Sequence, residues 1–292
     1  MIVIHLKGGL GNQMFQYAAA RNLALKYKTK LLGDFDSFLQ ASREAYTARH
    51  YELGIFDFKI RSIDKTVKNA FYETSSTKNM LIKFNLPYKK VYNELSFPFN
   101  EELQNIRPPL YMEGYFQSEK YFEQIADTIR NDFKFVVKPD DENYLLAKKI
   151  SSENSVGIHI RRADFLTSAA TLAFHGVCSI DYYKTAIDLI SKKQEVTLYF
   201  FSDETDWVQE NLIPLYPKAN VISFNKNENS WKDMYLMSKC KHNIIANSSF
   251  SWWAAWLNEN KNKIVVAPKP WFKDLSCNTK DLIPSQWIQI PN

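Results

Sequence analysis

The 292-residue sequence predicts an α/β protein of two domains, the second of them a mainly parallel sheet with helices on both faces. Strand and helix patterns alternate through the second half, and the first residues read as a strand, a glycine loop and a helix. A hydrophobic content of 45% over this length suffices for one large core or two ordinary ones. We place the domains at 1–145 and 146–292, because polar residues and a proline mark the segment from about 137 to 154 as the boundary.

The N-terminal strand covers residues 2–6, and Gly8-Gly9-Leu10-Gly11 separates it from a helix with apolar residues at helical spacing. A glycine loop that opens a helix is typical of dinucleotide binding, and Asp34 or Asp36 stands about twenty residues further on. Met14 occupies the place of the third glycine of that motif, where a long side chain would obstruct the packing of helix against strand. The loop therefore does not indicate a nicotinamide or flavin site.

The middle of the chain is less informative, and residues 59–109 predict only helices and loops. Residues 111–116 resemble a short buried strand, and residues 119–133 carry an apolar stripe typical of a helix. In the second half we expect strands at 155–160, 197–202, 221–224, 243–246 and 264–267, and helices at 182–192, 206–212, 231–239 and 251–258. Ligands of such a sheet bind at the carboxyl ends of its strands, near the point where the strand order reverses.

The net charge of +5 is spread along the chain without a long basic run. This pattern argues against a nucleic-acid-binding arm and suits an anionic substrate or a membrane surface. Three cysteines without C-x-x-C spacing indicate neither a disulfide framework nor a zinc site. Because the first residues lack the features of a signal peptide and no window approaches the roughly 20 apolar residues that span a bilayer, we expect a cytoplasmic protein.

Three polar clusters directly follow predicted strands, and all should face one crevice: His159 to Asp164, Ser202-Asp203-Glu204, and Asn247-Ser248-Ser249-Phe250-Ser251. Arg161 and Arg162 suit a diphosphate, because a guanidinium is always charged and its fork of donors matches phosphate oxygens. The alternative is a pair of surface ion pairs. The Asn-Ser-Ser turn opens a helix whose N–H groups and dipole favour an anion, although Asn and Ser are also the usual N-caps.

Two further side chains of these clusters each allow two interpretations. Asp203 either accepts N–H bonds from the edge of a guanine or caps the helix that begins near Asp206. Phe250 either stacks on a base or lies on the buried side of a helix. On that buried side we expect at least two of the tryptophans Trp252, Trp253 and Trp256.

An ordered set of motifs extends nearly from end to end. It begins with Gly8-Gly9-Leu10-Gly11-Asn12-Gln13-Met14-Phe15-Gln16-Tyr17-Ala18 and Gly114-Tyr115-Phe116-Gln117-Ser118. It continues with His159-Ile160-Arg161-Arg162-Ala163-Asp164, Cys178-Ser179-Ile180-Asp181-Tyr182-Tyr183, Phe201-Ser202-Asp203 and Ile244-Ile245-Ala246-Asn247-Ser248-Ser249-Phe250-Ser251-Trp252-Trp253-Ala254. In these motifs the chain resembles the bacterial α-1,2-fucosyltransferases of glycosyltransferase family 11.

The resemblance implies a GT-B-like fold of two Rossmann-like domains facing a cleft, with GDP-fucose held by the C-terminal half and the acceptor sugar by the N-terminal half. His159 and Arg161 would hold the GDP, Arg161 chiefly its diphosphate. The family pattern has a second aspartate where this chain has Glu204, so no role is transferred to that position. The nucleotide pocket would be completed by Ser202, Asp203, Asn247, Ser248, Ser249 and Phe250, whereas Gly9, Gly11, Asn12 and Gln13 would approach the fucose and the acceptor.

The implied reaction inverts the anomeric carbon through an oxocarbenium-like state, so Arg161 would stabilise the departing diphosphate. Asp164 follows the arginines on the same loop and is our candidate for the base that takes the acceptor proton; alternatively it orients one of the arginines. Asp34-Phe35-Asp36 has the D-x-D spacing of a metal site, but the arginines already supply the positive charge that a metal would provide. The resemblance implies a metal-independent enzyme without a cofactor.

We therefore expect an enzyme that transfers L-fucose from GDP-fucose to the 2-hydroxyl of a terminal β-galactose on an oligosaccharide or a lipid-linked O-antigen repeat. The same resemblance favours peripheral association with the inner face of the inner membrane. Two alternatives stay open. The chain is either a transferase for another GDP- or UDP-sugar or a non-catalytic carbohydrate-binding module.

Overall fold

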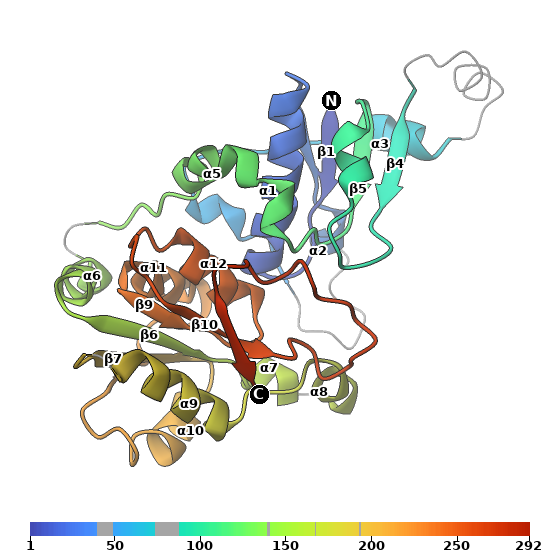
Figure 1. The fold of residues 1–292 in the computed structure, drawn as a ribbon. Coiled ribbons are helices and arrows are strands. Elements are labelled where there is room, and N and C mark those ends of the chain that lie inside the picture. The colour runs from blue at the N-terminus through green and yellow to red at the C-terminus, as the bar shows by residue number, and fades with distance from the viewer. Residues whose placement is uncertain (40–48, 74–87, 139–140, 167, 193) are drawn as a thin grey trace. The chain divides into compact units, whose positions relative to one another are not determined.

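The computed structural model describes residues 1–39, 49–73, 88–138, 141–166, 168–192 and 194–292. The chain forms two compact units (Figure 1). Unit 1 comprises Met1–Phe135 with Asn278–Leu282, and unit 2 comprises Val136–Cys277 with Ile283–Asn292. Unit 2 begins before the expected boundary at 145/146 because helix α6 (Glu142–Ser152) packs against helix α11 (Trp231–Lys239).

In the described part of unit 1, parallel strands form one sheet in the order β3-β2-β1-β5-β4. The strands are β1 (Ile2–His5), β2 (Leu31–Asp34), β3 (Arg61–Ser62), β4 (Lys90–Asn93) and β5 (Leu110–Glu113). The apolar side chains of central strand β1 are fully buried, as expected for a parallel sheet covered on both faces. The strand order reverses between β1 and β5, which makes the carboxyl ends of these two strands a natural binding edge.

The long helix α1 (Leu10–Lys26) packs along β1, and Phe71 of α3 (Lys65–Tyr72) packs against Val3 and Tyr111.

Two expectations for this unit were wrong. The segment 59–109 contains strands β3 and β4, which are too short to show a period of two. The single helix expected at 119–133 is broken at Phe122, whose φ of −145° is not helical. The other elements among the described residues of this unit are α2 (Asp36–Leu39), η1 (Leu53–Ile55), η2 (Glu101–Asn105), η3 (Glu119–Tyr121), η4 (Glu123–Ile125) and α5 (Ala126–Asp132).

Parallel strands of unit 2 form a sheet in the order β11-β10-β9-β6-β7-β8. They are β6 (Ser155–Ile160), β7 (Thr197–Ser202), β8 (Asn220–Ile222), β9 (His242–Ile244), β10 (Val265–Lys269) and β11 (Ile288–Pro291). The chain enters at β6, moves outward through β7 and β8, and returns to β9 on the other side. This is the Rossmann order, with its reversal between β6 and β9. The expectation of two Rossmann-like units is confirmed, and β11 is a strand that the sequence did not reveal.

Helices cover both faces of the unit 2 sheet (Figure 1). The helices α9 (Ile180–Ser191) and α10 (Thr205–Asn211) lie on one face, and α6, α11 and α12 (Ser249–Leu257) lie on the other. Ser179 begins α9, because its hydroxyl accepts the Tyr182 backbone N–H at 3.1 Å. Three short elements complete the unit: α7 (Ala163–Leu166), α8 (Ala169–His175) and η5 (Asn227–Asn229).

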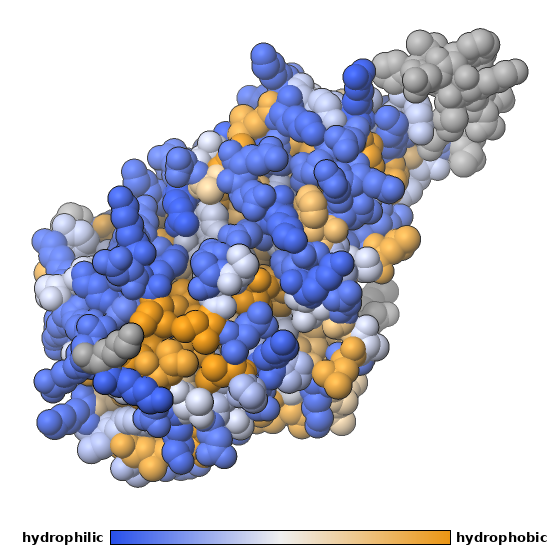
Figure 2. All heavy atoms as spheres, viewed as in Figure 1, coloured by the Kyte–Doolittle hydropathy of each residue, from blue (hydrophilic) through white to orange (hydrophobic). Residues whose placement is uncertain are grey.

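The surface differs between regions of the chain. Figure 2 shows a hydrophobic patch over the unit 2 sheet, whereas the visible surface of α1 and α5 is mostly hydrophilic. No helix among the residues that the structure describes is long and apolar enough to cross a membrane.

Candidate functional site

Unit 2 gathers the three predicted polar clusters at one edge of its sheet. Strand β6 lies between β7 and β9, and all three strands run in the same direction. Their carboxyl ends therefore place His159 to Asp164 between the Ser202-Asp203-Glu204 segment and the Asn247-Ser248-Ser249 turn. This is also where the strand order reverses, the usual ligand position of such sheets.

The two arginines are held by the carboxylates that follow β7. Asp203 Oδ2 lies 3.0 Å from Nη1 of Arg161, and Oδ1 accepts the backbone N–H of Arg162 at 3.0 Å. The Nε–H of Arg162 donates to Glu204 Oε2 at 2.9 Å, and its guanidinium lies 4.1 Å from the ring centroid of Trp207. A guanidinium has five N–H donors, so an ion pair through Nη1 is compatible with anion binding by the same side chain. Both arginines therefore form ion pairs, as the alternative interpretation predicted. These pairs belong to one network at the edge of the sheet and are not isolated on the surface.

The structure corrects the helix-capping interpretation of Asp203. The N-cap of α10 is Glu204, and no side chain caps this helix. The carboxylate of Asp203 is directed instead to the arginine segment of β6. Ser202 makes a local bond, in which its hydroxyl accepts the backbone N–H of Glu204 at 3.0 Å. Guanine recognition by Asp203 stays a prediction.

His159 is a buried, neutral side chain at this edge. Burial, and then the positive charge of Arg161, lower the pKa of His159 to about 3. Its Nδ1 atom is buried without a hydrogen-bond partner. Its ring centroid lies 5.5 Å from that of Phe250, and the Tyr183 hydroxyl donates to its backbone carbonyl at 3.2 Å. A neutral imidazole here can form hydrogen bonds but adds no charge.

The residues of the Asn247 turn have different tasks. Asn247 is 3% exposed, and its amide donates to the carbonyl of His175 at 2.8 Å, so this side chain fixes the turn to α8. The N-cap of α12 is Ser248, whose hydroxyl accepts the Phe250 N–H at 3.3 Å. Ser248, Ser249 and Phe250 are partly exposed. The turn thus combines a structural asparagine with a partly exposed helix N-terminus suited to an anion.

The tryptophans of α12 belong to the core. Trp252 and Trp253 are fully buried, and Trp256 is 4% exposed. The expectation that at least two of them are buried is therefore confirmed. Asp164 lies on the short helix α7, but its side chain is outside the described part of the structure, so neither of its predicted roles is tested.

The glycine loop of unit 1 is tightly bound to its own chain. Gly8 has a φ of +76°, and a Cβ added there would lie 2.6 Å from Nδ2 of Asn12. The Gln13 amide is fully buried, donates to the carbonyls of Gly8 and His50, and accepts the Glu52 N–H. In the structure Gln13 therefore fixes the loop, and its approach to the fucose and the acceptor stays a prediction.

The remaining loop residues lie at the start of α1. Gly9 is the N-cap, without a side-chain cap, and Gly11 is buried in the first turn. The carboxylate of Glu52 accepts the backbone N–H of Leu10 at 3.0 Å, so the chain itself places an anion at this helix N-terminus. Asn12 is partly exposed, and its Oδ1 accepts a hydrogen bond of 2.7 Å from Gln117.

The Gly114-Tyr115-Phe116-Gln117-Ser118 motif has a structural explanation. The partly buried carboxylate of Glu94 accepts the backbone N–H groups of Tyr115, at 2.6 Å, and Phe116, at 3.1 Å. A Cβ added at Gly114 would lie 2.4 Å from Cβ of Glu94, so only glycine fits. Burial raises the pKa of Glu94, and these N–H bonds oppose the rise. The motif therefore builds a rigid turn after β5.

The D-x-D sequence forms an ion-pair network in which Asp34 is buried and the Asp36 side chain is 49% exposed. Asp34 is 1% exposed, lies 2.6 Å from Nζ of Lys68 and accepts a hydrogen bond from the Tyr111 hydroxyl. Lys68 also lies 2.5 Å from Asp36. Burial raises the pKa of Asp34, but the bonds from Lys68 and Tyr111 outweigh it and hold this pKa below its usual value. Within the described residues, no group of three His, Cys, Asp or Glu side chains is arranged to hold a metal.

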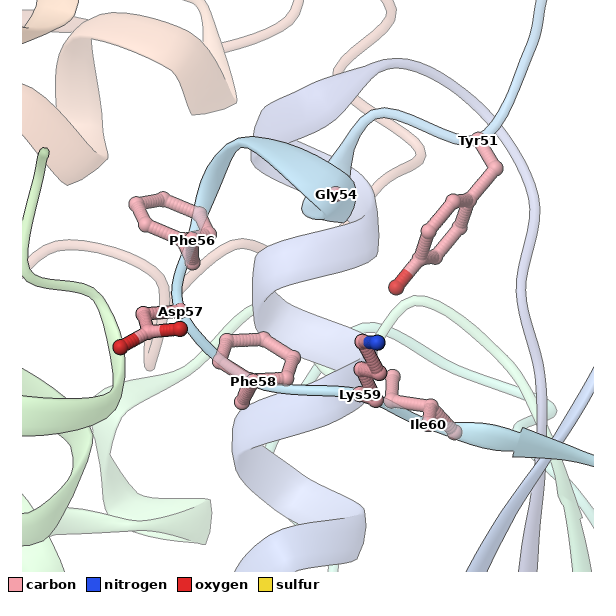
Figure 3. Close-up of a pocket in the computed structure, with 7 residues that line it drawn as sticks. All are labelled: Tyr51, Gly54, Phe56, Asp57, Phe58, Lys59 and Ile60. Carbon is pink, nitrogen blue, oxygen red and sulfur yellow. The ribbon is translucent and has the colours of Figure 1, made fainter.

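A pocket of unit 1 lies beside helix α1 (Figure 3). It is lined by Tyr51, Gly54, Phe56, Asp57, Phe58, Lys59 and Ile60. The ring of Phe58 stacks on Tyr17 of α1 with centroids 4.4 Å apart. Phe58 therefore holds this segment against α1, whereas Phe56 packs on Phe133 with ring centroids 4.9 Å apart.

Sequence reasoning missed several residues that position the site. Glu52 and Glu94 lie far along the chain from the N–H groups that they bind, and no local pattern links them. Glu204 carried a signal, because it directly follows the Ser-Asp pair, but its departure from the family pattern concealed its role. Trp207 sits one helical turn after it, a spacing that predicts a shared face.

Comparison with protein families matches the chain to Glycosyl transferase family 11 over residues 1–291. The O-antigen biosynthesis glycosyltransferase WbnK of Escherichia coli is 37% identical over 307 residues, which cover 98% of this chain and 99% of that protein. An alpha-1,2-colitosyltransferase of Escherichia coli is 30% identical over 301 residues, 99% of each chain. The galactoside alpha-(1,2)-fucosyltransferase 1 of Leontocebus fuscicollis is 25% identical over 167 residues, which cover 54% of this chain and 46% of that protein.

Proposed function

The chain belongs to glycosyltransferase family 11, and we propose that it transfers L-fucose from GDP-fucose to the 2-hydroxyl of a terminal β-galactose, with inversion at the fucose C1. The observation that supports this most is the unit 2 edge. There Arg161, Arg162, the neutral His159 and the N-terminus of α12 converge where the strand order reverses. These groups suit a nucleoside diphosphate.

In the proposed reaction the acceptor oxygen bonds to C1 while the bond from C1 to the diphosphate breaks and its electron pair leaves with GDP. Arg161 stabilises the charge that develops on the diphosphate, because Asp203 fixes its guanidinium before the substrate arrives. His159 donates or accepts a hydrogen bond without competing for charge. Ser248, Ser249 and Phe250 complete the nucleotide pocket. Ser202 and Asn247 fix the backbone beside it through hydrogen bonds to main-chain groups. Asp164 stays our first candidate for the base that takes the acceptor proton.

The relatives support both the linkage and the setting. The name of the WbnK relative supports an acceptor within an O-antigen repeat, and that of the galactoside fucosyltransferase supports α-1,2 transfer to galactose. The colitosyltransferase relative favours a second candidate donor, GDP-colitose, because colitose is fucose without the hydroxyl at C3. The unit 2 contacts that we assign to GDP suit either donor.

One experiment tests donor and reaction together. Purified protein is incubated with GDP-fucose or GDP-colitose and a panel of galactose-terminated oligosaccharides, and GDP release and product linkage are measured. We expect an α-1,2-fucosylated product and a kcat/KM for GDP-fucose at least about tenfold above that for GDP-colitose. The reverse preference would identify the second donor. Binding of glycans without any turnover would indicate a carbohydrate-binding module.

We also propose that the reaction needs no metal, because the unit 2 edge supplies cationic groups of its own. Activity should therefore persist in EDTA. Activity that EDTA abolishes and Mn²⁺ restores would contradict this.

Finally, we propose that the protein works in the cytoplasm, at the inner face of the membrane, where a lipid-linked acceptor would be found. A basic surface on unit 1 supports this proposal. It lies at the amino ends of the sheet strands, opposite the binding edge, and consists of Lys28, Lys30, Arg61, Lys89, Lys90 and Arg107. Each basic residue near an anionic bilayer contributes about 1 kcal/mol.

Vesicle binding tests the membrane proposal. Vesicles containing phosphatidylglycerol should sediment the protein at low salt, and neutral phosphatidylcholine vesicles should not. A double variant with Arg61→Glu and Arg107→Glu should lose this binding while it keeps its activity on a soluble acceptor. Equal sedimentation of the variant would overturn the proposal.

A further inference from the structure

A second group of partly exposed polar side chains lies at the carboxyl edge of the unit 1 sheet. His5 ends β1, Glu113 ends β5, and Ser37 lies on α2 directly after β2. Nε2 of His5 is 2.6 Å from Oγ of Ser37, and Nδ1 is 3.4 Å from Oε1 of Glu113. Nζ of Lys7 lies 3.7 Å from the same carboxylate oxygen. We call His5, Lys7, Ser37 and Glu113 the unit 1 edge cluster.

This cluster differs from a structural network such as that of Asp34. Asp34 is 1% exposed and bound to Lys68, Asp36 and Tyr111, whereas the side chains of His5, Lys7 and Glu113 are 17%, 29% and 35% exposed. The Nδ1 atom of His5 is buried and makes no aligned hydrogen bond, even with Glu113 nearby. A buried polar atom without a partner costs about 1–3 kcal/mol, which a ligand or a small rearrangement on binding can recover.

The chemistry of the cluster fits the hydroxyl groups of a neutral sugar. Lys7 donates, Glu113 accepts, and the Ser37 hydroxyl does both, as sugar hydroxyls do. Lys7 and Glu113 balance each other in charge, so the cluster does not favour an anionic sugar. Tyr115 adds a partly exposed ring, whose centroid lies 5.2 Å from Nζ of Lys7. An aromatic surface with a few convergent polar groups is typical of a small-molecule site.

The position of the unit 1 edge cluster favours substrate binding over a structural role. The cluster lies where the order of the unit 1 strands reverses, between β1 and β5. It is built from the ends of β1 and β5 and from the segment after β2, so it is fixed by the sheet rather than by a mobile loop. The buried Gln13 amide of the neighbouring glycine loop differs from this cluster, because its NH2 group and its oxygen form hydrogen bonds with backbone groups of the same chain.

We propose that the unit 1 edge cluster binds the acceptor hexose through its hydroxyl groups and sets the selectivity between acceptor sugars. This assignment rests on the proposed fucosyl transfer. Glu113 accepts a hydrogen bond from one sugar hydroxyl, Lys7 and His5 donate to others, and Tyr115 contacts an apolar face of the ring. The cluster acts on the acceptor alone and does not contribute to donor affinity.

Kinetics with both substrates tests the proposal. We expect Glu113→Gln and His5→Gln to raise the acceptor KM at least about tenfold while the KM for GDP-fucose changes less than about twofold. In a panel of monodeoxy β-galactosides the wild type should reject one analogue strongly, and Glu113→Gln should lose that discrimination at the same hydroxyl. Glu101→Gln, which changes an exposed carboxylate of unit 1, is the matched control and should leave both constants unchanged.

Two results would overturn the proposal. One is an acceptor KM that stays within about twofold of wild type in both variants; the other is a parallel change in the donor and acceptor constants, which indicates a general structural effect. Saturation-transfer NMR with methyl β-galactoside in the presence of GDP keeps the two proposals separate. If the wild type does not transfer fucose, the proposed function fails, and binding of the galactoside that is lost in Glu113→Gln still supports the subsite.

Discussion

In unit 1, helix α1 begins beside the carboxyl end of the central strand β1, and in unit 2, helix α12 begins next to the central strand β6. Both helix N-termini lie at a reversal of strand order. The N-terminus of α1 receives the carboxylate of Glu52. The N-terminus of α12 is capped by the hydroxyl of Ser248 and lies near the uncharged His159. The same strand topology therefore carries edges with different chemical groups in the two units.

This difference shows that the Rossmann topology provides the place for a ligand and the side chains decide its identity. A helix N-terminus attracts an anion in either unit. In unit 1 the chain supplies that anion itself, and the polar groups that stay partly exposed suit a neutral ligand. In unit 2 the arginines are positioned by Asp203 and Glu204, and the helix N-terminus is partly exposed. The two edges can therefore serve the two substrates of a transferase.

The largest effect should come from Arg161. Arg161→Ala should lower kcat about a hundred- to a thousandfold, because the charge that develops on the diphosphate loses its main stabilising donor. Arg161→Lys should restore only part of this loss, because an ammonium lacks the planar fork. Steady-state kinetics with GDP-fucose measures both, and Lys184→Ala, at an exposed ion pair of α9, is the control. Wild-type turnover in Arg161→Ala would remove the chemical distinction between the two edges.

Two carboxylates with shifted pKa values also distinguish the units. Asp34 in unit 1 is paired with Lys68 and has a lowered pKa, whereas burial raises the pKa of Asp233 in unit 2 to about 7, an effect that the hydrogen bond from Asn225 only partly opposes. Between about pH 4 and pH 7, Asp233 is therefore protonated in the folded state but ionised in the unfolded state. The free energy of unfolding consequently falls as the pH rises through this range.

Asp233→Asn should consequently stabilise the protein at pH 8 and have little effect near pH 4. The asparagine oxygen can still accept the hydrogen bond from Asn225, so the packing is preserved. The measurement is the melting temperature of both proteins from pH 4 to pH 8. A difference that does not grow with pH would show that Asp233 ionises normally.

A smaller effect is expected at the glycine loop. Gly8 has a positive φ, so Gly8→Ala should reduce the free energy of unfolding by about 1–2 kcal/mol. Gly9 provides the matched control, because its backbone is extended and a Cβ there would lie 3.7 Å from the Arg49 guanidinium, an ordinary contact. Denaturant unfolding of both variants measures the contrast. Equal losses would show that the loop does not depend on the conformation of Gly8.

Much of unit 2 could be predicted from the sequence, because β6 and β7 are largely buried runs of six residues and the polar clusters directly follow strands. The short strands β3 and β4 could not, since two to four residues show no period. Residues that act across long sequence separations were also hidden. Glu52 lies 42 positions from the N–H group that it binds, and His5 meets Ser37 and Glu113 only because β1 pairs between β2 and β5. The bonds of Gln13 were hidden as well, because a motif shows that a residue matters but not which groups of its own chain it contacts.

The smallest effect is expected at Glu52. Its substitution tests the comparison most directly, because it removes the carboxylate that unit 1 supplies to the N-terminus of helix α1. Glu52→Gln keeps an oxygen for the Leu10 N–H but loses the charge, so stability should fall by about 0.3–1 kcal/mol. Glu73→Gln, at the C-terminal end of α3, is the control and should not destabilise, because a negative charge is unfavourable there. Glu52→Ala goes further and exposes the N–H groups of α1, so added sulfate should raise its melting temperature more than that of the wild type. Equal responses to sulfate would mean that the start of α1 has no latent affinity for anions. The difference between the two edges would then lie in the backbone as well as in the side chains.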